Sequence, residues 1–125
     1  MNSLLNGITV LELTINVPGP FCSMNLSDLG ARVIKIEPPG GDPLRTEKEI
    51  WDNLNRGKES IVLDLKSTNG KLHLGKLAKI ADIVIEGWRP GVATKLSADY
   101  ETLKKEGLPL NLVAIVYFFQ LYHFC

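Results

Sequence analysis

Short apolar runs alternate with longer segments of helical periodicity along most of the chain. The apolar runs are rich in Ile, Val and Leu, have the length of buried strands, and cover residues 8–13, 32–36, 60–65 and 83–85. Residues 21–29 and 67–81 place apolar side chains at near-helical spacing, which predicts helices between the strands. This alternation favours an α/β fold, a parallel sheet with flanking helices.

Three further segments complete the predicted fold. Residues 99–105 are predicted as a short helix that ends at Gly107. Residues 111–119 are predicted as a fifth strand, provided that this segment is native to the fold. Residues 42–53 have the least periodicity of the chain and are predicted as a mobile loop.

The overall charge disfavours some classes of partner. Lys and Arg together number 14, and Asp and Glu together number 14, so no global field favours nucleic acid or an anionic membrane. With 45% hydrophobic and 22% charged residues, the 125-residue chain has the composition of one globular domain. We therefore expect no nucleic acid and no membrane as a partner, and we expect any anion site to be local.

The end of the chain differs in composition from the rest. Every charged side chain lies at or before Glu106, and residues 107–125 contain five of the nine aromatic residues. This segment is too short to span a bilayer as a helix of about 20 residues. It is either a buried strand or an out-of-frame tail. The predicted division is therefore a folded segment, 1–106, and an apolar divergent tail, 107–125.

The sequence indicates neither a metal site nor export. Cys22 and Cys125 have no CxxC spacing, and His73 and His123 add no ligands in register with them, so no metal site is predicted. The N-terminus has no basic region followed by a long apolar stretch, so a signal peptide is not predicted. We expect a reducing compartment: the cytoplasm, or the peroxisome or mitochondrion in a eukaryote.

The turns after the predicted strands carry the candidate binding residues, because ligands of open α/β sheets collect at the carboxyl ends of the strands. Val17 and Pro18 lead into the first predicted helix, whose free amides suit a phosphate or a thioester oxygen. The alternative is that the Pro-Gly-Pro sequence at 18–20 only separates two elements.

A rigid loop follows the fourth predicted strand. Its residues Gly87, Trp88, Arg89 and Pro90 place a flat aromatic ring beside a guanidinium, a pair able to stack on a purine and to bind phosphate. Alternatively, the tryptophan fills the core and the arginine is a surface charge. Lys95 follows about one helical turn beyond this loop.

Further cations lie around the third predicted strand. Lys58 precedes the strand, and Leu65 and Lys66 end it. Separated cations of this kind suit a ligand that carries several separated phosphates. A solvated surface position is the alternative for each lysine taken singly.

Five sequence motifs, at residues 18–24, 29–37, 39–43, 54–66 and 81–92, carry a resemblance to a known family. In sequence, order and spacing they resemble the N-terminal segment of the family III CoA-transferases, and most of all the alpha-methylacyl-CoA racemase branch, over residues 4–106. The resemblance implies a Rossmann-like N-terminal part of that family's fold. It also implies coenzyme A or an acyl-CoA as substrate, with no bound prosthetic group.

Under this resemblance the candidate residues become expected CoA-binding residues. They are Val17, Pro18, Lys58, Leu65, Lys66, Gly87, Trp88, Arg89, Pro90 and Lys95. The resemblance also implies a parent activity of 2-methylacyl-CoA epimerisation, by removal and return of the alpha proton. CoA transfer between carboxylic acids and non-catalytic binding of CoA are the alternatives.

No catalytic residue is assigned. Racemisation needs an acid/base pair, and CoA transfer by the usual route of the family needs a carboxylate nucleophile. The two histidines are expected on a helix surface and in the divergent tail, and Asp28, Asp42, Asp64 and Asp82 are explained by their positions in helix, loop or strand ends. The chain is therefore expected to be an incomplete enzyme that is inactive as given.

The chain also departs from the family pattern. Val17 replaces a frequent polar residue, Pro38 replaces a frequent arginine, and Ile115 replaces the Asp of a downstream Pro-x-Asn-Leu-x-Ala-Asp motif. The first two differences weaken a specific assignment to the CoA-transferases of the family. The third favours a truncation or frameshift after about residue 106, with a divergent fifth strand as the alternative. Family members form interlocked homodimers, and so short a chain is expected to expose apolar strand edges and to aggregate.

Overall fold

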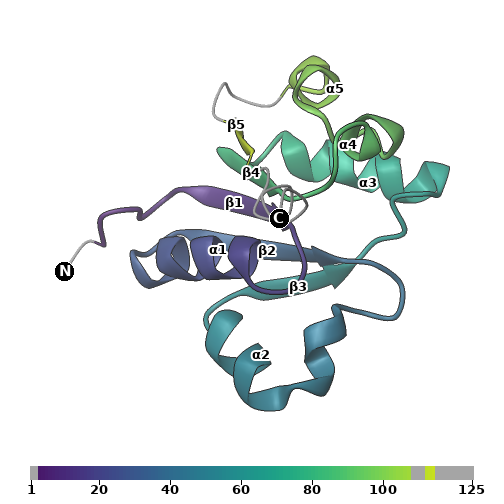
Figure 1. Cartoon of the computed structure of the whole chain (residues 1–125). Coiled ribbons are helices and arrows are strands. Elements are labelled where there is room, and N and C mark those ends of the chain that lie inside the picture. Colours follow the sequence, from purple (N-terminus) through teal and green to yellow (C-terminus); the bar gives the residue numbers. More distant parts are fainter. Residues whose placement is uncertain (1–2, 108–111, 115–125) are drawn as a thin grey trace, which may run out of the picture.

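The computed structural model describes residues 3–107 and 112–114, which form one parallel sheet with helices on both faces (Figure 1). The five strands lie in the order β3-β2-β1-β4-β5. Their bounds are β1 Thr9–Leu13, β2 Arg32–Glu37, β3 Glu59–Val62, β4 Ile83–Glu86 and β5 Leu112–Ala114. The predicted fold class, α/β with a parallel sheet and flanking helices, is confirmed.

The helical elements connect consecutive strands as crossovers. Their bounds are α1 Pro18–Asp28, η1 Pro43–Thr46, α2 Lys48–Leu54, α3 Thr68–Ala78, α4 Val92–Lys95 and α5 Tyr100–Lys105. In Figure 1 the helices α3, α4 and α5 gather beyond β4, whereas α2 lies near β3 at the other end of the sheet. The carboxyl ends of all strands therefore point to one edge of the sheet, where their following loops meet.

The two faces of the sheet are set by the alternation of side chains along each strand. Val10 in β1 is paired with Val33 in β2, and both pack with Leu26 of α1 on one face. The next residue in β1, Leu11, is paired with Ile34 and packs on the opposite face, with α3 and α5. One helix thus covers the first face and two helices cover the second.

The first helix begins earlier than predicted. We expected it after the Pro-Gly-Pro sequence, but α1 includes that sequence and starts at Pro18. Proline is well tolerated in the first helical turn, where its missing N–H would have no intrahelical acceptor. Gly19 allows the close approach of this turn to β1, because a Cβ there would lie 2.1 Å from Thr14 Oγ1.

The segment 42–53, predicted as a mobile loop, is helical over most of its length. The segment contains η1 and most of α2. Asp42 caps η1, with its Oδ1 accepting a hydrogen bond from the N–H of Leu44 at 2.9 Å. Both elements are short and bury few apolar side chains, with Leu54 the only buried residue of α2, so neither produces a clear periodicity in the sequence.

The remaining elements lie close to their predicted positions. β3 ends at Val62, three residues before the predicted end, and α3 occupies the inner part of the predicted helix 67–81. Helix α4 was not predicted. β5 falls inside the predicted strand 111–119, whose other positions lie outside the described residues. None of the helices in the described part of the chain is long and apolar enough to cross a membrane.

Candidate functional site

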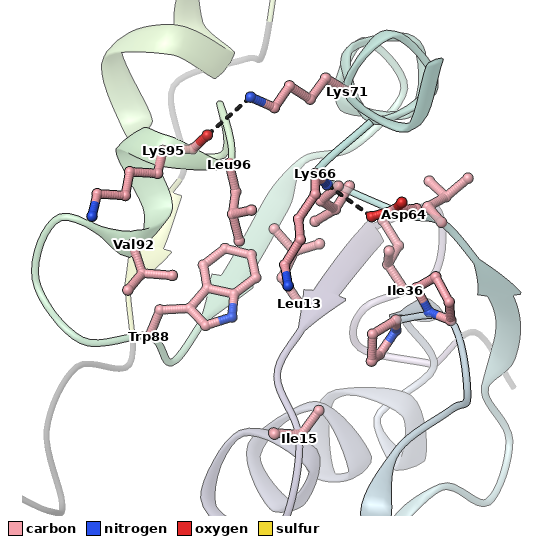
Figure 2. A pocket seen from close by; sticks show the side chains of 14 residues that line it. Leu13, Ile15, Ile36, Asp64, Lys66, Lys71, Trp88, Val92, Lys95 and Leu96 are labelled. Atoms are coloured by element: carbon pink, nitrogen blue, oxygen red, sulfur yellow. Dashed lines mark hydrogen bonds between the residues drawn. The ribbon is translucent and has the colours of Figure 1, made fainter. Parts of the chain in front are cut away.

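A cavity of about 810 Å³ lies at the carboxyl edge of the sheet (Figure 2). Segments that follow four neighbouring strands contribute to its lining, together with α3 and α4. The lining residues are Leu13, Ile15, Ile36, Pro38, Pro39, Leu63, Asp64, Leu65, Lys66, Lys71, Trp88, Val92, Lys95 and Leu96. This is the edge where parallel α/β sheets bind their ligands.

The base of the cavity is apolar and rigid. Leu13, Ile36 and Leu65 are buried there and belong to the larger core cluster of the protein. Trp88 and Leu96, both partly buried, pack against the same cluster. An apolar ligand segment would therefore meet a surface that is already formed and held by the core.

Among the described lining residues of the cavity, three lysines and one aspartate are charged. Figure 2 shows the Lys66 side chain extending into the cavity that Leu13 and Trp88 also line. Lys71 is partly ordered by the protein itself, because its Nζ donates a hydrogen bond to the Lys95 carbonyl at 2.9 Å. The three lysines and Asp64 sum to a formal charge of +2, which favours an anionic ligand.

The Trp88 ring is positioned by the loop between β4 and α4. The buried Glu86 carboxylate at the end of β4 accepts a hydrogen bond from the Trp88 N–H at 2.9 Å. Gly91, with φ of +82°, then caps α4 and turns the chain, a conformation that a side chain would strain. The ring is thereby fixed as one wall of the cavity while its neighbours remain exposed.

The structure brings four of the ten predicted CoA-binding residues together in the cavity wall. These are Leu65, Lys66, Trp88 and Lys95. Their contact with CoA stays a prediction, as does that of the other six.

The six remaining candidates are not in the cavity lining. Gly87, Arg89 and Pro90 are exposed on either side of Trp88 in the same loop. Val17 and Pro18 are exposed at the start of α1.

The α1 N-terminus offers fewer donors to an anion than we expected. Pro18 and Pro20 have no N–H, and the Phe21 N–H donates to the Val17 carbonyl at 2.8 Å. Only the Gly19 N–H remains as a donor among the first three helical residues.

Lys58 lies in a different environment from the other candidates. Its side chain is 2% exposed, and its Nζ donates to Glu12 Oε2 at 2.8 Å, to the Pro20 carbonyl at 2.9 Å and to Asn55 Oδ1 at 3.1 Å. Burial lowers the pKa of Lys58, and the neighbouring Glu12 carboxylate opposes that effect. All three ammonium donors are thus engaged inside the protein.

The sequence analysis missed the charged network to which Lys58 belongs. Glu12 is fully buried in β1, and its Oε1 accepts a hydrogen bond from Lys35 Nζ at 2.7 Å. Burial by itself raises the pKa of Glu12, but Lys35 and Lys58 together hold that pKa below its ordinary value. A signal was present in the sequence, because Glu12 and Lys35 each interrupt an apolar strand and lie opposite each other in the β1–β2 register.

Side chains considered for catalysis or metal binding are placed as follows. His73 is exposed on α3 and is not in the cavity lining. Asp64 does line the cavity, where its Oδ1 accepts the Lys66 N–H at 3.0 Å. Asp28 pairs with Arg56 at the surface. Within residues 3–107 and 112–114 no group of three His, Cys, Asp or Glu side chains is arranged to hold a metal ion.

Two comparisons of sequence identify relatives. The sequence model of CoA-transferase family III matches residues 5–115, which includes part of the segment assigned above to a divergent tail. Human alpha-methylacyl-CoA racemase is 40% identical over 121 residues, covering 97% of this chain and 30% of the human protein. Acetyl-CoA:oxalate CoA-transferase of Acetobacter aceti is 44% identical over 108 residues, covering 80% of this chain and 28% of that enzyme.

Solved structures agree with these matches. A hypothetical protein from Mycobacterium tuberculosis superposes with a TM-score of 0.89 at 36% identity, over 94% of this chain and 34% of that one. A CAIB/BAIF family protein from Brucella suis superposes with a TM-score of 0.85 at 35% identity, over 91% of this chain and 33% of that one. The chain spans about 30% of the length of the racemase and 28% of the transferase that it matches. Over the part that it spans, the chain belongs to CoA-transferase family III.

Proposed function

We propose that the cavity binds the CoA part of coenzyme A or of an acyl-CoA thioester. The observation that carries this proposal is that Lys66, Lys95 and Trp88 line one cavity with an apolar base, at the carboxyl edge of the sheet (Figure 2). CoA combines a flat purine, several phosphates and a long uncharged arm. The cavity offers an aromatic face, separated cations and an apolar surface for these three parts.

Each wall of the cavity then has a role. Trp88 stacks on the adenine ring, and Lys66 and Lys95 bind phosphate groups. The uncharged arm lies against the buried side chains at the ends of β1 and β2. Arg89, exposed beside the tryptophan, is available to a phosphate outside the cavity.

For the whole protein we propose a reaction on CoA thioesters, with 2-methylacyl-CoA epimerisation as the first candidate. The human racemase, 40% identical, favours it. Transfer of CoA between carboxylic acids is the second candidate, and the 44% identical Acetobacter enzyme favours that one. Because the chain is similar to both kinds of enzyme, the similarity supports a shared CoA site more strongly than it supports either reaction.

For this chain by itself we propose binding without turnover. Epimerisation requires one group to remove the alpha proton and another to return it from the opposite face. Asp64 is the one carboxylate among the described lining residues, and no histidine is among them. A single carboxylate next to a lysine does not provide two opposed acid/base groups.

The proposal is tested by mapping CoA onto the folded chain with amide chemical shifts. Addition of CoA should shift the indole N–H of Trp88 and the amides of Leu65 and Lys66, in a saturable manner. The indole of Trp51, which stacks with Arg45 away from the cavity lining, serves as an internal control. Shifts confined to residues outside the cavity, or no shifts in a folded sample, would contradict the proposed site.

A parallel assay separates binding from catalysis. In deuterium oxide, the chain by itself should leave the alpha hydrogen of a 2-methylacyl-CoA unexchanged at CoA concentrations that saturate the shifts. Alpha-hydrogen exchange above the rate in buffer would contradict the proposal that this chain lacks the acid/base pair.

A further inference from the structure

The segment between β2 and η1 forms one wall of the cavity, yet its own residues make few contacts that would hold it there. Pro38 and Pro39 line the cavity and are exposed. The Gly41 N–H donates to the Pro38 carbonyl at 2.9 Å, and Gly40 has φ of +93°. This is the pattern of a type II turn, with proline and then glycine at its two central positions. The turn fixes its own shape but not its direction relative to the sheet.

The Glu37 side chain supplies the missing constraint. Its side chain is 1% exposed, and its carboxylate receives hydrogen bonds from residues that follow the turn and from β3. Oε2 accepts the Asp42 N–H at 2.9 Å and Arg45 Nε at 2.7 Å, and Oε1 accepts Arg45 Nη2 at 2.6 Å and the Ser60 hydroxyl. The carboxylate therefore ties the residue after the turn to the strand end before it.

A second contact, made by its carboxylate, holds Asp42 in place. The buried Asp42 Oδ2 lies 3.0 Å from Lys35 Nζ, as an ion pair without hydrogen-bond geometry. Lys35 in turn is held by Glu12 at the centre of the sheet. Asp42 is thus fixed through its amide by Glu37 and through its carboxylate by a lysine whose own position is set by the core.

The space around the turn is also closed to larger residues. A Cβ at Gly41 would lie 3.0 Å from Arg45 Cδ and 3.3 Å from Glu37 Oε2, and the φ of this residue is +83°. The Arg45 guanidinium is stacked on Trp51, with its carbon 4.1 Å from the ring centroid. The partners of the Glu37 carboxylate are consequently ordered themselves, so the carboxylate has one favoured set of hydrogen bonds.

We propose that Glu37 is a positioning residue for the CoA site, because its carboxylate holds the 38–41 turn in the orientation that makes Pro38 and Pro39 a wall of the cavity. This inference rests on the proposed function, since the ligand of the cavity is taken to be CoA. Glu37 does not line the cavity and acts only through the turn. Removal of the Glu37 carboxylate should therefore weaken the binding of CoA without removing any group that contacts CoA.

The test compares Glu37→Gln with the unmodified chain by two measurements. Glutamine keeps the shape of the side chain but places an NH₂ group opposite the donors of Asp42 and Arg45. We expect the amides of Gly41 and Asp42 to exchange with solvent about tenfold faster by local opening, at rates that low concentrations of urea leave unchanged, whereas amides in the centre of the sheet report only the change in global stability. We expect the Kd for CoA, measured by calorimetry, to rise about tenfold because the wall is no longer preorganised.

Two further variants and a control make the comparison specific. Glu37→Asp keeps both oxygens and the charge, and should restore part of the lost affinity. Arg45→Gln removes two of the hydrogen bonds from a side chain that is 47% exposed, and replaces Glu37→Gln if that variant does not fold. Glu59→Gln is the matched control, because it breaks an exposed pair with Arg32 on the same sheet and should leave both measurements unchanged.

The failures are distinguishable. Absence of CoA binding by the folded, unmodified chain would overturn the proposed function and with it the role of Glu37 toward this ligand. Clear binding by that chain with an unchanged Kd in Glu37→Gln would overturn the positioning role alone. Exchange at Gly41 and Asp42 that rises with urea as steeply as in the centre of the sheet would also overturn it, since these amides would then open only by global unfolding.

Discussion

Lys35 and Glu12 are neighbours in the β1–β2 register and form an ion pair of 2.7 Å in the interior of the sheet, with both side chains at most 1% exposed. Each residue lies between apolar residues of its strand. The pair connects the two central strands to α1 through the Ser23 hydroxyl, which donates to Glu12 Oε2 at 2.6 Å. A charged contact therefore occupies a place where this fold would normally have apolar packing.

Removal of one member of this pair should be strongly destabilising. In Lys35→Met the carboxylates of Glu12 and Asp42 lose their shared cation inside the protein, and we expect the free energy of unfolding in urea to fall by about 3–5 kcal/mol. Arg32→Met, which breaks the exposed pair with Glu59, is the control and should cost at most about 1 kcal/mol. Equal losses in the two variants would contradict this account of the buried network.

Stability should decrease in acid through Glu37. Its hydrogen bonds to Arg45 lower the pKa of this carboxyl from an ordinary value of 4.5 to about 2, against the opposing effect of burial. A lowered pKa means that the stabilisation is complete above pH 4.5 and is lost as the pH falls toward 2.

Unfolding curves measured at several pH values check this effect. The difference in unfolding free energy between the unmodified chain and Glu37→Gln should be largest near neutrality and should shrink between pH 4.5 and 2. A difference that is independent of pH over this range would show that the Glu37 carboxyl does not titrate as described.

Substitution of Gly19 should disturb the start of α1. An alanine Cβ at this position would lie 2.1–2.4 Å from three atoms of the Thr14 side chain, so either the strand end or the helix must shift. We expect Gly19→Ala to lower the free energy of unfolding by about 2 kcal/mol or more. Asn25→Ala, at an exposed position of the same helix, is the comparison. A neutral Gly19→Ala would contradict the close packing of this turn on β1.

Lysines of the cavity should contribute to CoA affinity, in contrast to lysines elsewhere. Lys66→Ala and Lys95→Ala should each weaken CoA binding by about fivefold to tenfold, the effect of losing one charge-assisted contact at a partly exposed site. Arg89→Ala should have a smaller effect, because this residue is exposed outside the cavity lining. Lys79→Ala, at the end of α3, should leave the affinity unchanged. Equal CoA affinities in all four variants would contradict the proposed CoA site.

The sheet was predictable from the sequence because each strand carries a local apolar signal. The run from Ile8 to Leu13 and the run Ile83-Val84-Ile85 are short, rich in branched residues and followed by turn residues. The loop of Trp88 was predictable for a similar reason, since aromatic and glycine residues lie close together directly after a strand. Local patterns of this kind do not depend on the rest of the chain.

The remaining features depend on contacts between distant residues. Lys58 has the sequence context of a surface lysine, and only the fold brings its ammonium to Glu12, 46 residues earlier. The predicted strand 32–36 ends just before Pro38, but the place of Pro38 in the cavity wall depends on the side chain of Glu37 and on Asp42. Such long-range polar contacts have no period in the sequence that would reveal them.

Calorimetric titration of the folded chain with CoA tests the central claim most directly, when it is carried out in parallel with Trp88→Ala and with dephospho-CoA. We predict saturable binding at one site, clearly weakened by Trp88→Ala and weakened by loss of the 3′-phosphate. Absence of binding, or binding that Trp88→Ala leaves unchanged, would contradict the claim that this cavity is a CoA site.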